Sequence, residues 1–591
     1  MQPGCMYAGS ALAISGMLDG FNIINIGSIE EKEKKMKLAR VFQDNMVMQR
    51  RMPILIWGST DKEEEIIVRM NGQEVYREVV IPGAVSFQIP PQEAAEDVAL
   101  EIGDITLHHV DFGEVWVAGG QSNMEFMLKY DQDGEGEIAS ANDAHLRTYI
   151  VGQYSFAGER EEGYKSWNPW DRWLPYKSES AAELPAVAVY FAKELRKAGI
   201  PVGILSCNWG GTTASAWLNP KYLLADPDLK TYVDDFQALV DKLDLERYFA
   251  IKKVVNPVMN SPQSAKMNEI IVKNTFHPDK SMEMIASFAK ERGTVQGDAK
   301  EHQETEGLDS SSIPMEEIMA IGPGDKAEPG SLYENMLKEI LGYSVQGVIW
   351  YQGETDEPKA WMYDKLFTAM INCWRREWKQ RNDGMERMPF LFVQLAPYGT
   401  WMNNTSERYP ILRRQQEIVS KSVQDVYMTS ISDIGNVYDI HPKEKAPVGK
   451  RLSLLARKYV YGETDLLADA PEAKEMVCDG DTVRISFRYG DGLYQSKGDF
   501  SQYNGFALEE IWKELVPPVL GGINGLRVYV DEEELTDANC TVEEEQLLIH
   551  SSKFSTAESI KVEFAQTAFY QVNLFNRAEL PVKPFVLADV R

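Results

Sequence analysis

Cysteine is scarce in this chain, and its placement excludes two kinds of scaffold. The 591 residues hold five cysteines, an odd number scattered from Cys5 to Cys540, and no pair has the C-x-x-C spacing. A disulfide framework and a zinc ribbon both need closely spaced, paired cysteines. The cysteine pattern therefore disfavours both and favours a reducing compartment.

Basic clusters and long apolar runs are also missing. Lys and Arg together number 61 against 90 Asp and Glu, which gives a formal net charge of −29. A surface this acidic repels phosphate backbones, so we expect no nucleic-acid partner. No apolar run approaches the roughly 18 residues that a membrane-spanning helix needs, so we expect no membrane partner.

The N-terminus lacks a clear targeting signal. "GSALAISGML" is a short apolar stretch, but no Lys or Arg precedes it, whereas a secretory signal has a positively charged start. We therefore predict that residues 1–35 are an extension outside the fold, with a weak signal peptide as the alternative. Cytoplasmic localisation is the corresponding expectation, and a secreted or periplasmic protein is the alternative.

The chain is too long for one ordinary core, and its patterning changes three times. Residues 36–110 show short alternating strands, with an Asn-Gly hairpin signal in "MNGQ", and predict a β-sandwich-like domain. Residues 111–465 alternate apolar strands with amphipathic helices, which predicts an α/β domain with a three-layer, parallel-sheet architecture. A charged insertion at about 222–329 interrupts it, and residues 466–591 form a second β-rich region.

The stretch "VWVAGGQSNMEF" places Ser122 at a corner between a strand and a helix. One interpretation is purely structural, because Ser and Asn favour turns and helix caps. The other is functional, because open α/β sheets bind ligands at the carboxyl ends of their strands. There the N–H groups at the start of the following helix can hold an oxyanion.

Two further strand ends carry polar or flexible residues and favour the functional interpretation. "SCNWGGTTASAW" ends a strand at Gly210 and Gly211, where a backbone N–H can approach a ligand unobstructed. "VIWYQGETD" ends another strand with Gln352, a side-chain donor, beside Glu354.

A serine nucleophile needs a base that titrates near neutrality, and histidine is the usual one. Only His441 follows a strand of the α/β pattern, with Asp433 and Asp439 nearby and a helix behind it. The others belong to the β regions, the insertion or a polar stretch: His108, His109, His145, His277, His302 and His550. His441 is therefore the predicted base.

Together these segments resemble the SGNH hydrolase superfamily and, within it, the sialate O-acetylesterase family. The resemblance runs from about residue 38 to the end, without the insertion, and no G-x-S-x-G elbow of the α/β-hydrolase kind surrounds Ser122. The motifs that carry it are "GQSNMEF", "NWGGTTASAWL", "LYENML", "GVIWYQGETD", "DIHPKEKAPVGKRL" and "NLFNRAELPVKPF".

The resemblance implies an SGNH-hydrolase-like fold and a serine esterase that removes O-acetyl groups from sialic acid. Ser122 then corresponds to the nucleophile and His441 to the base. The oxyanion positions match the backbone N–H groups of Ser122 and Gly211 and the side chain of Gln352, where asparagine is common elsewhere in the superfamily.

The third member of the triad is less well defined. Many superfamily members place an aspartate three residues before the histidine, and that position is Tyr438 here. Asp439 is the first candidate, Asp433 and Glu354 are alternatives, and a dyad without an acid also fits.

Residues near the motifs supply candidate sugar contacts, and Trp209, Tyr351, Glu354 and Arg413 are the substrate-binding predictions. Most of the aromatic ones fit a core role equally well. The chemistry requires no metal and no cofactor. "DQDGEGE" at 131–137 lacks the spacing of an EF-hand and predicts a solvated loop.

Two other functions stay open. An acetylxylan or other glycan O-acetylesterase would use the same catalytic motifs, because specificity resides in loops. A carbohydrate-binding protein without activity would have no use for the Ser122–His441 pair. The acetyl position, the oligomeric state and the role of the insertion, as a lid or a subunit contact, are not determined by the sequence.

Overall fold

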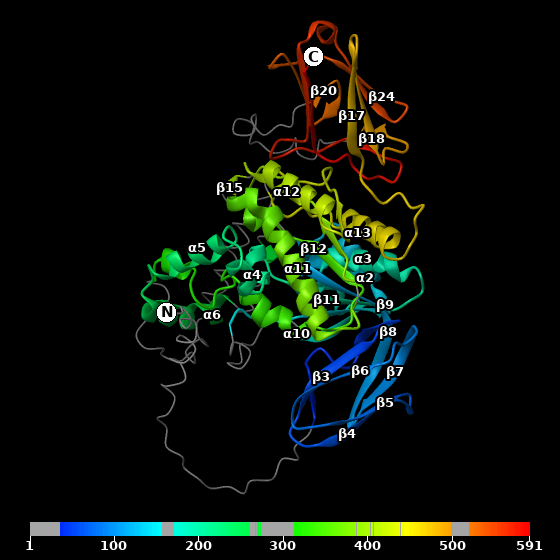
Figure 1. The fold of residues 1–591 in the computed structure, drawn as a ribbon, viewed down its shortest axis with the longest axis vertical. Coiled ribbons are helices and arrows are strands. Elements are labelled where there is room, and N and C mark those ends of the chain that lie inside the picture. Colours follow the sequence, from blue (N-terminus) through cyan, green and yellow to red (C-terminus); the bar gives the residue numbers. More distant parts are fainter. Residues whose placement is uncertain are drawn as a thin grey trace, which may run out of the picture.

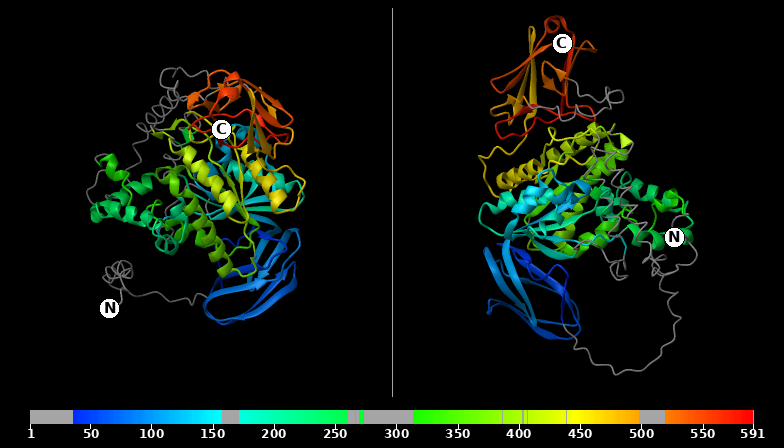
Figure 2. Two further views of the ribbon diagram at one scale, coloured as in Figure 1. Left: turned by 45° about the horizontal axis from the view of Figure 1, so that its top comes forward. Right: turned by 180° about the vertical axis from the view of Figure 1, so that it is seen from behind.

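The computed structural model describes residues 36–156, 171–259, 313–497 and 519–590, apart from positions 386, 402, 403, 406 and 438, together with residues 266, 269, 270 and 272. The predicted extension 1–35 lies outside these residues. The chain is a mixed α/β protein, with a β region at each end of a helix-rich centre (Figures 1 and 2).

The N-terminal β region is built from two sheets. A three-stranded antiparallel sheet faces a larger sheet, and Tyr76 stacks on Phe87 between them with ring centroids 5.4 Å apart. The Asn-Gly hairpin is confirmed, because Asn71 and Gly72 both have positive φ and join two antiparallel strands. The strands are β1 (Lys37–Leu38), β2 (Val47–Gln49), β3 (Ile54–Thr60), β4 (Glu64–Met70), β5 (Gln73–Val80), β6 (Gly83–Ile89) and β7 (Ala95–Ile102).

One strand, β8 (Ile105–Gly120), belongs to both the N-terminal region and the central sheet. It pairs with β7 through its first half and with the central strands through its second half. The boundary that the sequence suggested after residue 110 therefore falls inside a strand. The buried side chains of the two regions form one continuous hydrophobic cluster.

The central sheet is parallel except at one edge. Its order is β10-β9-β11-β8-β12-β13-β16, and only the β9–β10 pair is antiparallel. The added strands are β9 (Asn142–Ile150), β10 (Arg172–Lys177), β11 (Val202–Asn208), β12 (Gly347–Tyr351), β13 (Phe390–Val393) and β16 (Val426–Thr429). Later strands are added on both sides of β8, so the strand order reverses there, and ligands bind at such switch points in α/β sheets.

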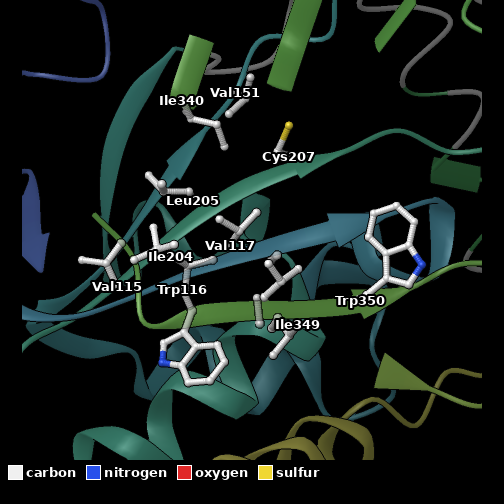
Figure 3. Packing of buried hydrophobic residues seen from close by; sticks show 14 of the residues in the cluster. Val115, Trp116, Val117, Val151, Ile204, Leu205, Cys207, Ile340, Ile349 and Trp350 are labelled. Atoms are coloured by element: carbon white, nitrogen blue, oxygen red, sulfur yellow. The ribbon is translucent and has the colours of Figure 1, made fainter. Parts of the chain in front are cut away.

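Helices cover both faces of this sheet. Trp116 on β8 packs against Phe191, at 5.1 Å, and Trp350 on β12 packs against Trp374, at 5.5 Å. Trp350 pairs with Gly119, an odd number of residues from Trp116, so the two indoles point to opposite faces (Figure 3). The long helices concerned are α3 (Ala186–Arg196) and α13 (Ala446–Tyr459), which pack on each other, and α11 (Tyr363–Arg381) and α12 (Tyr409–Ser422).

The remaining α-helices follow strand ends or lie in the described part of the insertion. They are α1 (Ser122–Glu125), α2 (Gly134–Ser140), α4 (Pro220–Leu224), α5 (Lys230–Val240), α6 (Leu245–Met259), α9 (Met315–Ile318) and α10 (Lys338–Ile340). None of the described helices is both long and apolar enough to cross a membrane.

The C-terminal β region has a hydrophobic core of its own. It contains two four-stranded antiparallel sheets, in the orders β17-β18-β25-β24 and β23-β22-β26-β28. Their strands are β17 (Glu472–Asp479), β18 (Thr482–Arg488), β22 (Leu526–Val530), β23 (Glu533–Glu534), β24 (Asn539–Glu543), β25 (Gln546–His550), β26 (Ser559–Phe564) and β28 (Phe585–Val590).

Candidate active site

The corner at Ser122 exists because β8 ends at a glycine that no other residue can replace. Gly120 has φ +138°, and a Cβ there would lie 2.1 Å from the carbonyl oxygen of Tyr351 on the neighbouring strand. The chain turns at this point, and α1 begins at Ser122. The serine therefore sits at the carboxyl end of the strand at the switch point, as the sequence predicts.

Ser122 and His441 meet although they are 319 positions apart in the sequence. Nε2 of His441 lies 2.8 Å from Oγ of Ser122. Nδ1 of the same ring lies 3.1 Å from Oδ1 of Asp439, which also accepts the backbone N–H of His441 at 2.8 Å. A carboxylate can only accept here, so Nδ1 carries the proton and Nε2 can accept the one from Ser122.

Asp439 is buried, with its side chain 1% exposed, and is held as an anion. Burial alone raises the pKa of Asp439, but the hydrogen bond from His441 and the positive charges of His441 and Lys443 lower it to about 2. Nζ of Lys443 is 2.8 Å from Oδ2. Asp433, the alternative acid, instead forms a two-pronged pair with Arg451 at 2.7 Å on each side.

Gly210 and Gly211 follow β11 and lie directly beside Ser122. A Cβ on Gly210 would be 3.1 Å from the Cβ of Ser122. Gly211 has φ +72°, a conformation that suits glycine. Within the described part of the chain, the backbone N–H groups of Ser122 and Gly211 donate to no acceptor.

Gln352 lies at the end of β12 and is fully buried. Its Nε2 donates to the carbonyl oxygen of Thr212 at 3.1 Å and to Asp356 at 2.5 Å, and its Oε1 accepts from Tyr363 at 2.9 Å. Both amide hydrogens are therefore in use, and an oxyanion contact from Gln352 requires one of these bonds to break.

Behind Ser122 lies a fully buried polar network centred on Asn123. Its amide nitrogen donates to Glu354 at 2.6 Å and to the carbonyl oxygen of Ile440 at 3.0 Å. Its oxygen accepts from Lys445 at 2.5 Å. Burial raises the pKa of Glu354 to about 7 and lowers that of Lys445 to about 7. Asn123 thus links the serine corner to the backbone next to His441.

The predicted sugar contacts separate into different environments. Trp209 is half-buried beside Gly210, whereas Tyr351 is fully buried and Glu354 belongs to the network around Asn123. Arg413 is buried, and its guanidinium donates to four backbone carbonyls, of Leu395, Ala396, Thr567 and Ala568. Arg413 therefore ties the catalytic region to the C-terminal β region and has little capacity left for a substrate.

The segment 131–137 is a solvated loop only in part, because Gln132 and Asp133 are exposed but their neighbours are buried or helical. Asp131 is buried and accepts the hydroxyl of Tyr190 and the backbone N–H of Lys445, both at 2.9 Å. Helix α2 then begins at Gly134. In the described part of the chain, no group of three or more His, Cys, Asp or Glu side chains is placed to hold a metal ion.

Sequence reasoning assigned no role to three residues at this site: Asn123, Lys445 and Lys326. The first two lie inside the quoted motifs "GQSNMEF" and "DIHPKEKAPVGKRL", and their place close to Ser122 and His441 in the sequence was the available signal. Lys326 comes from the insertion, and its Nζ donates to the carbonyl oxygen of Gly210 at 2.6 Å. No local pattern marks it.

Comparison with known proteins agrees with this geometry. The family of carbohydrate esterases described as sialic acid-specific acetylesterases matches residues 300–454. Sialate O-acetylesterase of Rattus norvegicus is 24% identical over 411 residues, which cover 65% of this chain and 64% of that protein. The protein of that name from Homo sapiens is 22% identical over 404 residues, covering 65% and 60%. The matched part thus spans less than two thirds of these relatives.

A solved structure adds the fold over most of the chain. The crystal structure of a carbohydrate acetylesterase from Xanthomonas citri superimposes with a TM-score of 0.63 at 26% identity, covering 94% of this chain and 99% of that one. At this coverage the superposition extends into both flanking β regions. Residues 300–454 thus resemble the carbohydrate esterase domain of sialic acid-specific acetylesterases, and the fold over most of the chain is similar to that of a carbohydrate acetylesterase.

Proposed function

We propose that this chain is a serine esterase that hydrolyses O-acetyl esters of sialic acids through an acetyl-enzyme. The observation that carries the proposal is the Ser122–His441–Asp439 chain of contacts, at 2.8 and 3.1 Å, at the switch point of the sheet. The helices on both faces of a largely parallel sheet support an SGNH-hydrolase-like three-layer arrangement.

In this mechanism His441 accepts the proton of Ser122 as the hydroxyl oxygen attacks the acetyl carbonyl. The backbone N–H groups of Ser122 and Gly211 stabilise the negative oxygen of the tetrahedral intermediate. His441 then protonates the departing sugar oxygen, which leaves Ser122 acetylated. Water, deprotonated by His441, attacks the acetyl-enzyme, and acetate leaves as the proton returns to Ser122.

Asp439 supports both proton transfers. Its carboxylate fixes the ring so that Nε2 faces Ser122, and its charge stabilises the imidazolium that forms in each step. The low pKa of Asp439 keeps it ionised over the range in which histidine acts as a base.

The test measures acetate release from O-acetylated sialic acid, acetylated xylan and an aryl acetate. Ser122→Ala is compared with Ser178→Ala, a serine on the surface. We expect release from sialic acid to exceed that from xylan and to vanish only in Ser122→Ala. Serine-dependent release of acetate from xylan but not from sialic acid would identify acetylated xylan as the substrate. Hydrolysis that persists in Ser122→Ala would show that Ser122 is not the nucleophile. No cleavage of any ester by the unmodified protein would favour the carbohydrate-binding function.

A further inference from the structure

The peptide group between Gly210 and Gly211 follows a residue that lies beside Ser122, and its carbonyl contacts the insertion. The described peptide bonds include no cis bond, so the carbonyl of Gly210 and the N–H of Gly211 point in opposite directions. The N–H of Gly211 is one of the two donors assigned above to the oxyanion. The carbonyl on the opposite side accepts the ammonium of Lys326 at 2.6 Å.

Lys326 lies on the segment by which the chain returns from the insertion, just before Gly330 bonds to the carbonyl of Ser215 at 3.0 Å. Its Nζ lies 5.5 Å from the centre of the Trp209 ring. No carboxylate among the described residues comes within ion-pair distance of it, although the negative charges of Glu125 and Asp325 raise its pKa against the lowering by burial. Its only hydrogen bond within the described chain is therefore the one to Gly210.

Two titratable side chains hold Gly210 at its two ends; burial lowers the pKa of Lys326, and the negative charges of Glu125 and Asp325 raise it. Glu125 accepts the N–H of Gly210 at 2.6 Å, and Lys326 donates to its carbonyl. Hydrogen bonds to a charged partner are stronger than neutral ones, and a donor on an amide oxygen polarises the amide and makes its N–H a better donor. The hydrogen bond from Lys326 therefore acts on the N–H of Gly211, which belongs to the same peptide group, whereas Glu125 holds the preceding peptide group.

We propose that Lys326 is a positioning residue for the oxyanion hole, supplied by the insertion. It orients the Gly210–Gly211 peptide and strengthens the Gly211 N–H without touching the substrate. The inference rests on the proposed function, in which Ser122 is the nucleophile. It gives the insertion a catalytic task, distinct from that of a lid or a subunit contact.

The insertion also reaches the acid side of the site. Nζ of Lys443, which pairs with Asp439, donates to the carbonyl oxygen of Val272 at 2.7 Å. The insertion thus contacts a group next to the oxyanion hole and a group next to the triad acid.

The experiment compares Lys326→Met, Lys326→Arg and Lys252→Met. Lys252 pairs with Asp325 at 3.7 Å, so Lys252→Met loosens the same loop without removing the contact to Gly210. The substrate is a neutral aryl acetate, which has no carboxylate for Lys326 to bind. A trifluoromethyl ketone that adds to Ser122 serves as an analogue of the tetrahedral oxyanion.

We expect Lys326→Met to lower kcat by about 10- to 100-fold, less than the loss of a whole oxyanion donor, with KM changed less than about twofold. The inhibition constant of the ketone should rise by a similar factor. Lys326→Arg should recover part of kcat, and Lys252→Met should remain near the unmodified protein.

Three outcomes would overturn the inference. They are unchanged kcat in Lys326→Met, a rise in KM alone, and an equal loss in Lys252→Met, which would assign the effect to loop order. Failure of the proposed function is separate, because it shows as activity that persists in Ser122→Ala.

Discussion

Two groups of polar side chains near Ser122 each contain a carboxylate and a lysine. The histidine side comprises Asp439 and Lys443 beside His441, and the inner side comprises Glu354 and Lys445 around Asn123. Asp439 is in direct contact with His441 and Lys443, which lower its pKa to about 2. The side chain of Glu354 accepts a hydrogen bond from Asn123 and has no cation in direct contact among the described residues. Burial raises its pKa to about 7. In the described chain, its second oxygen has no hydrogen-bond partner.

Direct pairing therefore decides whether a buried carboxylate stays charged. On the histidine side, Asp439 stays ionised where the proposed mechanism forms an imidazolium. The inner side, where Asn123 separates Glu354 from Lys445, has no such need and works mainly as a spacer that holds the serine corner against the histidine loop.

The largest effect is expected from Asp439→Asn. The change keeps the shape but removes the negative charge and can turn an N–H toward His441, which selects the wrong ring tautomer. We expect kcat to fall by about 10³–10⁴-fold, measured with an aryl acetate at neutral pH. Asp433→Asn is the matched control, because Asp433 pairs with Arg451 instead. A larger loss in the control would assign the acid to Asp433.

A smaller effect is expected from Asn123→Ala on the inner side. The variant loses three hydrogen bonds, and Glu354 and Lys445 lose their common partner. The free energy of unfolding should fall by about 2–4 kcal/mol, measured with urea, because buried polar groups are left unsatisfied. One of the lost hydrogen bonds is the one to the carbonyl of Ile440, next to His441. We therefore expect kcat to fall by about 10-fold. Unchanged stability would contradict the spacer role.

The smallest effect on rate is expected from Glu354→Gln, which retains an acceptor for Asn123. We expect kcat to stay within about threefold of the unmodified protein, since the site needs no charge there. A loss of the size expected for Asp439→Asn would make Glu354 the triad acid and reverse the comparison.

The same variant tests the raised pKa of Glu354. Between its ordinary value of 4.5 and about 7, the folded state holds a proton that the unfolded state has lost, so this group lowers stability as pH rises. The unmodified protein should lose up to about 3 kcal/mol from this source between pH 4.5 and 7. Glu354→Gln should lack that loss in urea unfolding at the two pH values. An identical pH dependence in both proteins would show that Glu354 titrates normally.

The sequence was sufficient to predict the positions of residues that follow strand ends. Ser122, Gly211 and His441 each follow a buried strand, and the carboxyl ends of neighbouring parallel strands meet at one edge. The edge strand β10 was not predicted, because its antiparallel pairing with β9 does not follow from its own residues.

Side-chain direction and long-range partners could not be predicted. Arg413 was chosen for its charge, yet the carbonyls it binds include those of Thr567 and Ala568, more than 150 positions away. Gln352 shows the same limit, since one group that occupies its amide, the carbonyl of Thr212, lies 140 positions away. Lys326 approaches Gly210 across 116 positions.

Because 319 positions separate Ser122 from His441, the ribosome synthesises the serine well before the histidine. At a synthesis rate of about 5–20 residues per second, the histidine leaves the peptidyl-transferase centre roughly 15–60 s after the serine. During that interval the serine has no base, and its hydroxyl is as unreactive as any other. Esterase activity on nascent chains should therefore begin only after the histidine loop has emerged and docked, so ribosome-bound fragments that end before it should release no acetate.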